Sequence, residues 1–171
     1  MSYKFQQLDK KLDGIRGSID RFASSFYDNL LKAHPEFQNL FKHSDMAEQK
    51  KMLAGILILV IRNWQRPQML ASTLKRLGAR HVRYGALSEY YLLFGEVLLL
   101  TFKQYLGSDW DREMEQAWSE VYEAITTLML EGYNEAKKAN GYLIERKSAP
   151  SQQNQQSLIK LLYKNNYKRE S

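Results

Sequence analysis

The chain has 171 residues, of which 44% are hydrophobic and 12% aromatic, and this suffices for one globular domain with a buried core. It contains no cysteine, which excludes disulfides, thiolate-bound metals and thioether-linked cofactors. The formal net charge of +6 is unevenly distributed, because residues 137–171 hold eight Lys or Arg and two Asp or Glu while residues 1–136 are formally neutral. The main domain therefore gives no indication of a nucleic-acid partner.

Apolar runs in the chain are short. The longest, residues 52–61, falls far below the ~20 residues that a membrane-spanning helix needs. The N-terminus lacks the apolar run of a signal peptide. We therefore expect a cytoplasmic protein without membrane contact.

In the first half of the chain, apolar residues recur at helical spacing and strand-like alternation is scarce. Two amphipathic helices are expected before His34, where Pro35 disfavours a helical predecessor. Their apolar positions are Leu8, Leu12, Ile15, Ile19, Phe22, Phe26, Tyr27 and Leu30. A short apolar turn follows at residues 37–41. The next apolar stripe runs to Trp64, and it is opened by Gln49, one turn before Leu53 on the same face.

The second half continues the helical pattern. Leu70, Leu74, Leu77 and His81 step by four, three and four, so His81 shares the buried face of its helix. Residues 90–106 are apolar almost all round, which predicts a central helix buried on most sides. After Gly107, Ser108 and Asp111 resemble a capping box for a long last helix. The inward positions of that helix are Met114, Trp118, Val121, Tyr122, Ile125 and Met129. The predicted class is all-α, with about seven helices.

The domain is expected to span residues 1–140 and to be followed by a basic, polar tail at 141–171. Asn140-Gly141 is a helix stop, and residues 148–157 are linker-like. The short apolar run 158–163 leaves three readings of the tail open: a disordered end, a short helix and a docking segment.

His81 is the residue with the clearest chemistry. A single imidazole on an apolar helix face, with a polar donor from another helix, is how an all-α protein holds a haem iron. A satisfied core histidine gives the same pattern, so the residues alone leave both interpretations open. His34 and His43 are expected at the surface, with iron ligation by His43 as a disfavoured alternative.

Several ordered motifs narrow these interpretations. They are Phe26-Tyr27-x-Asn29-Leu30 with His34-Pro35-Glu36 and Leu40-Phe41, Glu48-Gln49-x-Lys51, Leu77-Gly78-x-Arg80-His81-x-x-Tyr84-Gly85, and Ala117-Trp118-x-x-x-Tyr122. In this order and spacing the chain resembles the globins, most closely the bacterial single-domain globins related to the globin domain of flavohaemoglobins. The resemblance covers about residues 5–139 and implies a 3-over-3 globin fold with a C-terminal extension.

The resemblance also implies a non-covalent haem b with His81 as the proximal iron ligand. It gives Tyr27 and Gln49 the role of a distal pair that donates hydrogen bonds to a bound diatomic gas, with Leu53 crowding that gas. The other residues expected to contact the haem are Phe41, Leu77, Tyr91, Phe94 and Tyr122. Two alternatives remain open, namely that Tyr27 is a core aromatic bonded to backbone and that Gln49 turns to solvent.

One position departs from the family pattern. Flavohaemoglobin-type globins have a glutamate late in the last helix that, with the proximal tyrosine, hydrogen-bonds the proximal histidine. A gapless count places Tyr133 there, and the nearest glutamate is Glu131. If Glu131 points away, His81 pushes less electron density onto the iron, which puts peroxidase-like cleavage of O–O bonds in doubt.

The expected function is therefore that of a haem globin that reversibly binds O2, NO and CO. A distal tyrosine with glutamine implies tight retention of O2, which suits reaction or sensing better than bulk oxygen transport. NO dioxygenation for NO detoxification would need a separate reductase, because the short tail cannot supply an FAD- or NAD-binding module. A gas or redox sensor signalling through the tail and a haem-free helical interaction domain are the alternatives. Enzymatic activity, and the choice between monomer and homodimer, stay open.

Overall fold

The computed structural model describes residues 13, 15, 17–63 and 66–139, and every regular element in this part is helical. The elements are α2 (Ile19–Ala33), α3 (Phe37–Phe41), α4 (Met46–Asn63), η1 (Pro67–Leu70), α5 (Ala71–Arg83), α6 (Tyr90–Leu106), η2 (Gly107–Asp109) and α7 (Arg112–Ala139). The predicted all-α class is confirmed. The predicted positions Leu8, Leu12 and Trp64 and the tail 141–171 lie outside the described residues.

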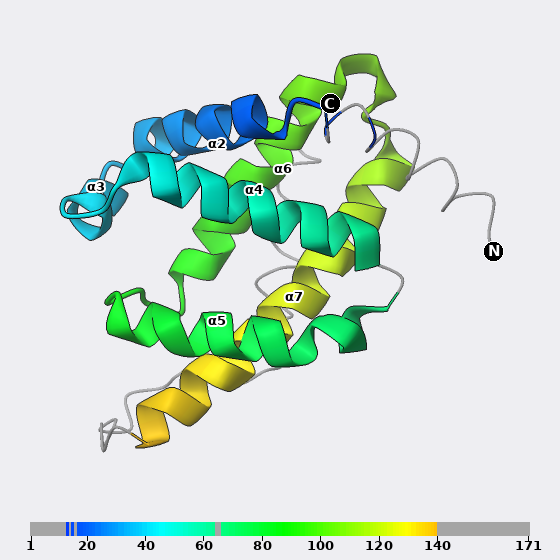
Figure 1. Ribbon diagram of the computed structural model, residues 1–171. Helices are drawn as coiled ribbons and strands as arrows, with labels where there is room; N and C mark the ends of the chain where they lie inside the picture. The colour runs from blue at the N-terminus through cyan, green and yellow to red at the C-terminus, as the bar shows by residue number, and fades with distance from the viewer. Residues whose placement is uncertain (1–12, 14, 16, 64–65, 140–171) are drawn as a thin grey trace.

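The helices form two layers with α6 between them. Helices α2 and α4 lie side by side, α2 also contacts α6, and α5 crosses α7 on the other side (Figure 1). An aromatic column joins the layers: the ring of Phe22 in α2 lies 4.6 Å from that of Phe102 in α6, which stacks at 4.1 Å on Trp118 in α7. These rings place the core between α2, α6 and α7.

Helix α2 follows directly from its sequence. Phe22, Phe26 and Leu30 recur every four residues and are fully buried, so one face of the helix packs into the core. The helix ends at Ala33, because His34 precedes a proline and adopts a non-helical backbone with φ −134° and ψ 77°. The end predicted near His34 is confirmed.

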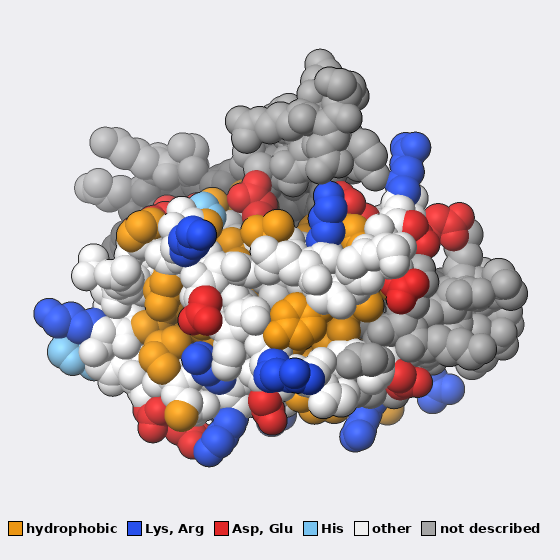
Figure 2. All heavy atoms as spheres, turned by 90° about the horizontal axis from the view of Figure 1, so that it is seen from above, with side chains coloured by type: hydrophobic (Ala, Val, Ile, Leu, Met, Phe, Trp, Pro, Cys, Tyr) orange, Lys and Arg blue, Asp and Glu red, His pale blue; other side chains and the backbone are white. Residues whose placement is uncertain are grey.

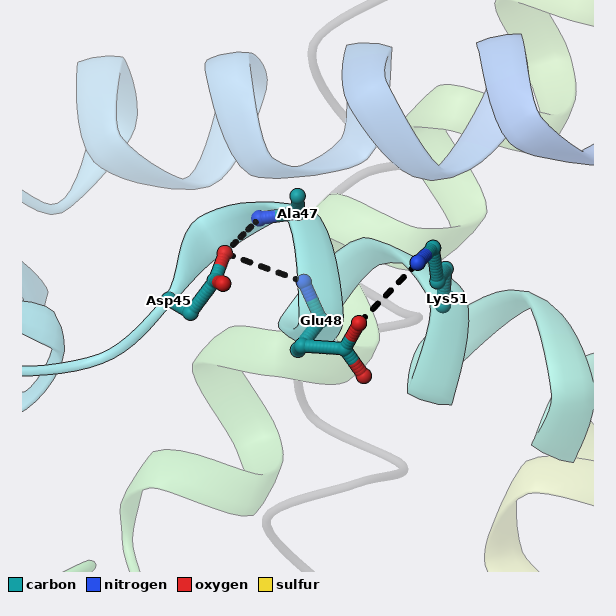
Figure 3. A network of polar contacts seen from close by, with 4 residues as sticks. All are labelled: Asp45, Ala47, Glu48 and Lys51. Carbon is teal, nitrogen blue, oxygen red and sulfur yellow. Dashed lines mark hydrogen bonds and ion pairs between the residues drawn. The ribbon is translucent and has the colours of Figure 1, made fainter.

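The start of α4 is held by a side-chain cap (Figure 3). One carboxylate oxygen of Asp45 accepts hydrogen bonds from the backbone N–H groups of Ala47 at 2.8 Å and Glu48 at 3.3 Å. Glu48 also forms an exposed ion pair with Lys51 at 3.0 Å. The cap satisfies two N–H groups that have no partner within the helix, and it fixes the first turn of α4, where Gln49 lies.

Replacing Asp45 by alanine is expected to lower the free energy of unfolding by about 1 kcal/mol, because the two N–H groups lose their acceptor. Urea denaturation followed by circular dichroism measures this change. Lys51→Ala serves as the control, since it breaks only an exposed ion pair and should leave the midpoint unchanged. Equal losses in both variants would contradict the capping role.

The start of α7 corrects one prediction. The carboxylate of Asp111 accepts from the backbone N–H of Met114 at 2.8 Å, and α7 begins at the next residue, Arg112. Ser108 lies in η2, before the extended residue Trp110. The predicted capping box starting at Ser108 is therefore wrong, because the cap is Asp111 itself and the helix starts three residues later.

Helices α5 and α7 cross so closely that their backbones are in contact at two glycines. A Cβ on Gly78 of α5 would overlap the carbonyl oxygen of Met129, and a Cβ on Gly132 of α7 would overlap that of Lys75. Both glycines are buried. This double contact fixes α5 on α7 one turn before His81.

The surface carries mixed charge. Figure 2 shows the face seen from above, where described Lys, Arg, Asp and Glu side chains alternate with exposed hydrophobic ones. This pattern agrees with the formal neutrality of residues 1–136. Among the described residues, none of the helices combines the length and hydropathy that a bilayer crossing requires.

Candidate functional site

His81 lies near the C-terminal end of α5, with its ring half-buried. Its Nδ1 is 2.7 Å from the backbone carbonyl oxygen of Leu77. Because a carbonyl can only accept, Nδ1 carries the proton and the lone pair of the neutral ring is on Nε2. Burial lowers the pKa of His81 and outweighs the opposite effect of the Leu77 hydrogen bond, so the neutral form is favoured. A neutral imidazole with Nδ1–H bonded to a carbonyl is the usual form of a metal-ligating histidine.

Tyr91 of α6 lies beside His81, with ring centroids 5.8 Å apart. Its side chain is buried, and its hydroxyl has no hydrogen-bond partner in the described part of the chain. Burial, with a smaller contribution from Tyr133, raises the pKa of Tyr91, so the phenol stays protonated. A buried hydroxyl without a partner is costly, and a bound group beside His81 would supply one.

A second cluster brings together Tyr27, Phe41 and Gln49. The ring of Tyr27 in α2 lies edge-on to that of Phe41 at 5.4 Å, and its hydroxyl donates to the backbone carbonyl of Gln49 at 3.5 Å. Burial raises the pKa of Tyr27 to about 12, so its hydroxyl remains a donor. Leu53, one turn after Gln49 in α4, is buried, and the Gln49 side chain is half-buried. The distal residues predicted from the sequence, Tyr27, Gln49 and Leu53, therefore lie in one region, and Phe41, predicted as a haem contact, lies beside Tyr27.

The two clusters are linked through α6. Tyr91 is followed one turn later by Phe94, whose ring lies 4.4 Å from that of Phe26, the neighbour of Tyr27. Phe94 and Leu77 are both partly buried against the core. Phe94 thus contacts the sequence neighbour of Tyr27 and lies one turn from Tyr91, whose ring lies beside His81.

Tyr122 of α7 supports that stretch. Its hydroxyl donates to the backbone carbonyl of Tyr91, and its ring lies so close to Gly95 that a Cβ there would overlap it. These two contacts of Tyr122 are with the α6 backbone. Its predicted contact with a cofactor stays a prediction.

The gapless count leads to Tyr133 at the family's glutamate position, with Glu131 as the nearest glutamate. Glu131 forms an ion pair with Lys75 of α5 at 2.8 Å and so points away from His81. Tyr133 is buried, its ring lies 6.4 Å from that of Tyr91, and its hydroxyl donates to the backbone carbonyl of Ala86 at 3.0 Å. The sequence did not reveal which atom the Tyr133 hydroxyl contacts.

The remaining histidines lie elsewhere. His34 is half-buried, with its Nδ1 3.5 Å from a carboxylate oxygen of Glu36, and His43 is exposed. No group of three or more His, Cys, Asp or Glu side chains that could hold a metal occurs within the described residues. Haem iron needs only one protein ligand, because the porphyrin supplies four nitrogens, and the neutral imidazole of His81 fits that requirement.

Comparison with known proteins gives the family. The sequence model of the globin family matches residues 24–129. A flavohemoprotein from Rhizobium meliloti is 33% identical over 99 residues, which are 57% of this chain and 25% of that protein. A flavohemoprotein from Chromobacterium violaceum is 30% identical over 125 residues, which are 70% of this chain and 31% of that protein. The chain thus spans between a quarter and a third of the length of these relatives.

Solved structures agree on the fold. A bacterial globin from Campylobacter jejuni superposes with a TM-score of 0.69 at 19% identity, covering 81% of this chain and 99% of that one. An engineered carbene transferase from Rhodothermus marinus, provisionally assigned as a nitric oxide dioxygenase, gives the same TM-score at 23% identity and covers 85% and 99%. Since the family model matches more than half of the sequence and the helices fold in the same way, the chain belongs to the globin family.

Proposed function

We propose that this chain is a haem globin that reversibly binds O2, NO and CO. The observation that carries the proposal is the hydrogen bond from Nδ1 of His81 to the carbonyl of Leu77, which leaves Nε2 free to ligate iron beside the unpaired Tyr91 hydroxyl. The names of the flavohemoprotein relatives support a haem in this chain. A non-covalent haem b is the form proposed, since the chain has no cysteine for a thioether link. When bound, the haem supplies a ferrous iron that takes up a diatomic gas.

Around the haem, the chain would provide apolar contacts to the ring and one main hydrogen-bond donor to the bound gas. Phe41, Leu53, Leu77, Phe94 and Tyr122 are the proposed apolar and aromatic contacts. Tyr27 is the proposed hydrogen-bond donor to the gas, assisted by Gln49. The Tyr27 hydroxyl is held only by a 3.5 Å bond at the outer limit of hydrogen-bond distance, so little is lost when it donates to a ligand instead.

Replacing Tyr27 by phenylalanine is expected to speed O2 dissociation about tenfold or more. The lost hydrogen bond goes to an acceptor with partial negative charge, and such bonds contribute about 1.5–3 kcal/mol. Stopped-flow displacement of O2 by CO measures the rate. Tyr105→Phe is the matched control, because it removes a tyrosine hydroxyl bonded to Ser25 at the other end of α6. An unchanged rate in Tyr27→Phe would remove Tyr27 from the distal role.

The proposed function is tested most directly by visible absorption spectra. The purified protein is measured in the ferric state, after reduction with dithionite, and after exposure to O2, NO and CO. A Soret band that shifts on reduction and again with each gas is expected. A protein that shows no Soret band after reconstitution with haem would overturn the proposal and leave the interaction-domain alternative.

NO dioxygenation is a narrower extension of the same proposal. Haem bound at His81 would supply the one electron needed to combine NO and O2 into nitrate, and a separate reductase would have to return this electron. The flavohemoprotein relatives and the provisionally assigned nitric oxide dioxygenase support the extension. Sustained NO consumption in air should therefore require both the haem-loaded chain and a flavin reductase with NADH. NO consumption equal to that of the reductase alone would contradict it.

A further inference from the structure

Helices α2 and α6 are joined by a chain of polar side chains. The side-chain amide of Asn29 in α2 donates to the hydroxyl oxygen of Thr101 at 3.0 Å and to Oε1 of Gln104 at 2.8 Å, both in α6. The Thr101 hydroxyl in turn donates to the backbone carbonyl of Val97 at 2.7 Å. Thr101 is fully buried, so this chain of hydrogen bonds reaches into the core and ends on the α6 backbone.

These hydrogen bonds lie beside Tyr27. Asn29 follows Tyr27 by two residues and Phe26 precedes it directly, and the ring of Phe26 lies 4.4 Å from that of Phe94 in α6. The Tyr27 hydroxyl makes the 3.5 Å bond to the Gln49 carbonyl, at the outer limit of hydrogen-bond distance. The position of Tyr27 is therefore fixed more by its neighbours in α2 than by its own hydroxyl.

The two kinds of contact between α2 and α6 constrain different movements. Apolar attraction is not directional, whereas hydrogen bonds weaken steeply when their angles change, so the Asn29 bonds define the rotation of α2 about its axis. At about 100° per residue, Asn29 and Tyr27 point from nearly opposite sides of that axis. A rotation that stretches the Asn29 bonds therefore also displaces the Tyr27 hydroxyl, and the length of the tyrosine side chain enlarges the displacement.

We propose that Asn29 is a positioning residue for Tyr27. Through Thr101 it fixes the rotation of α2 against α6, and thereby the place at which the Tyr27 hydroxyl donates to a bound gas. The inference rests on the proposed function, since it requires Tyr27 to be that donor. Helix α6 also carries Tyr91, beside His81, so the same bonds set the distal donor against the helix that borders the iron ligand. Asn29 acts through Tyr27 and is assigned no contact with the haem or the gas.

The first test removes the hydrogen bond from each end in the full haem-loaded chain. Asn29→Leu and Thr101→Val nearly preserve the two side-chain shapes and lose the bond between them. The readouts are the rate of O2 dissociation and the C–O stretching band of the CO complex, which reports the polarity around the bound gas. Both variants should release O2 about two- to fivefold faster, the equivalent of part of one hydrogen bond, and should shift the band towards its position in Tyr27→Phe. Tyr105→Phe is the control, since it removes the bond of Tyr105 to Ser25 between the same two helices, and it should change neither readout.

The second test separates the positioning of Tyr27 from a general loss of structure. Asn29→Leu is combined with Tyr27→Phe, and the O2 dissociation rate is compared with that of Tyr27→Phe alone. If Asn29 acts by placing the Tyr27 hydroxyl, its removal has no further effect once that hydroxyl is gone. A loosened distal pocket would instead speed O2 release in both backgrounds.

Thr101→Ser is the conservative variant. It retains the hydroxyl that accepts from Asn29 and donates to Val97, so it should keep the wild-type O2 rate and C–O band, in contrast to Thr101→Val. It also deletes a buried methyl group, so urea denaturation should show a loss of stability. A loss of stability without a change in O2 release is not expected if Thr101 affects the gas through stability alone.

The outcomes distinguish the two proposals. Faster O2 release and a shifted band in Asn29→Leu and Thr101→Val, without a further effect in the Tyr27→Phe background, support the positioning role. Wild-type values in both variants, an equal effect in the Tyr27→Phe background or an equal effect in Tyr105→Phe overturn it while the haem globin stands. An unchanged O2 rate in Tyr27→Phe alone also overturns it. A wild-type protein that takes up no haem overturns both.

Discussion

Replacing His81 by alanine is expected to abolish stable haem binding, with a loss of affinity of about a hundredfold or more. Even residues that only support a metal ligand typically contribute 10- to 100-fold to affinity, and His81 is the proposed ligand itself. Titration of the apoprotein with haem, followed at the Soret band, measures the affinity. The fold should persist, because the His81 ring is half-buried and its hydrogen bond to Leu77 lies within its own helix.

Two further variants test whether the loss of haem affinity is due to the loss of the nitrogen ligand. His34→Ala removes another half-buried histidine, one that pairs with Glu36 instead, and should leave haem affinity unchanged. His81→Gly leaves space for an added imidazole, which should restore the Soret band if the missing contribution is the nitrogen ligand. A normal haem spectrum in His81→Ala would contradict the assignment of the iron ligand.

Adding a single methyl group at Gly78 or Gly132 is expected to destabilise the fold by about 3 kcal/mol or more, at the upper end of the usual range for overpacking. Each new Cβ would overlap a backbone carbonyl of the facing helix, Met129 or Lys75, and backbone cannot move aside as a flexible side chain can. For a chain of this length the melting temperature should fall by roughly 6–12 °C. Thermal and urea unfolding of Gly78→Ala and Gly132→Ala, followed by circular dichroism, measure the loss.

Gly55→Ala is the matched control for both variants. Gly55 lies inside α4, and a Cβ there would meet no atom within 4 Å. Alanine loses less backbone freedom on folding than glycine does, so this variant should be more stable by about 0.5–1 kcal/mol. If Gly78→Ala and Gly132→Ala also gained stability, the close crossing of α5 and α7 would be disproved.

Much of the fold could be predicted from local signals. Pro35 ended α2 at the expected place, and α6 has the predicted bounds, residues 90–106, because Gly107 follows an uninterrupted apolar segment. The start of α7 was misplaced, since both Ser108 and Asp111 are good capping residues and only the path of the chain selects Asp111. The pairing of Gly78 with α7 depends on how two distant helices cross, and no local pattern in the sequence encodes it.

The candidate site, too, could be predicted from the sequence only in part. The spacing from Leu70 to His81 indicated which face His81 occupies, but the tautomer set by Leu77 required the coordinates. The approach of Tyr27 to Gln49, 22 residues apart, depends on the packing of α2 against α4. The burial of Tyr133 could have been predicted from the sequence, because this residue continues the inward face of α7 four residues after Met129.

The crossing at Gly78 and Gly132 also has a mechanical consequence. Two helices in backbone contact at two points cannot slide along each other without overlap, so α5 and α7 respond to a force as one rigid lever. A displacement of α5 is therefore expected to move α7 with it. Helices α2 and α4 are joined instead by the hydrogen bond from the Tyr27 side chain to the Gln49 carbonyl, a contact that can lengthen without overlap of the two backbones.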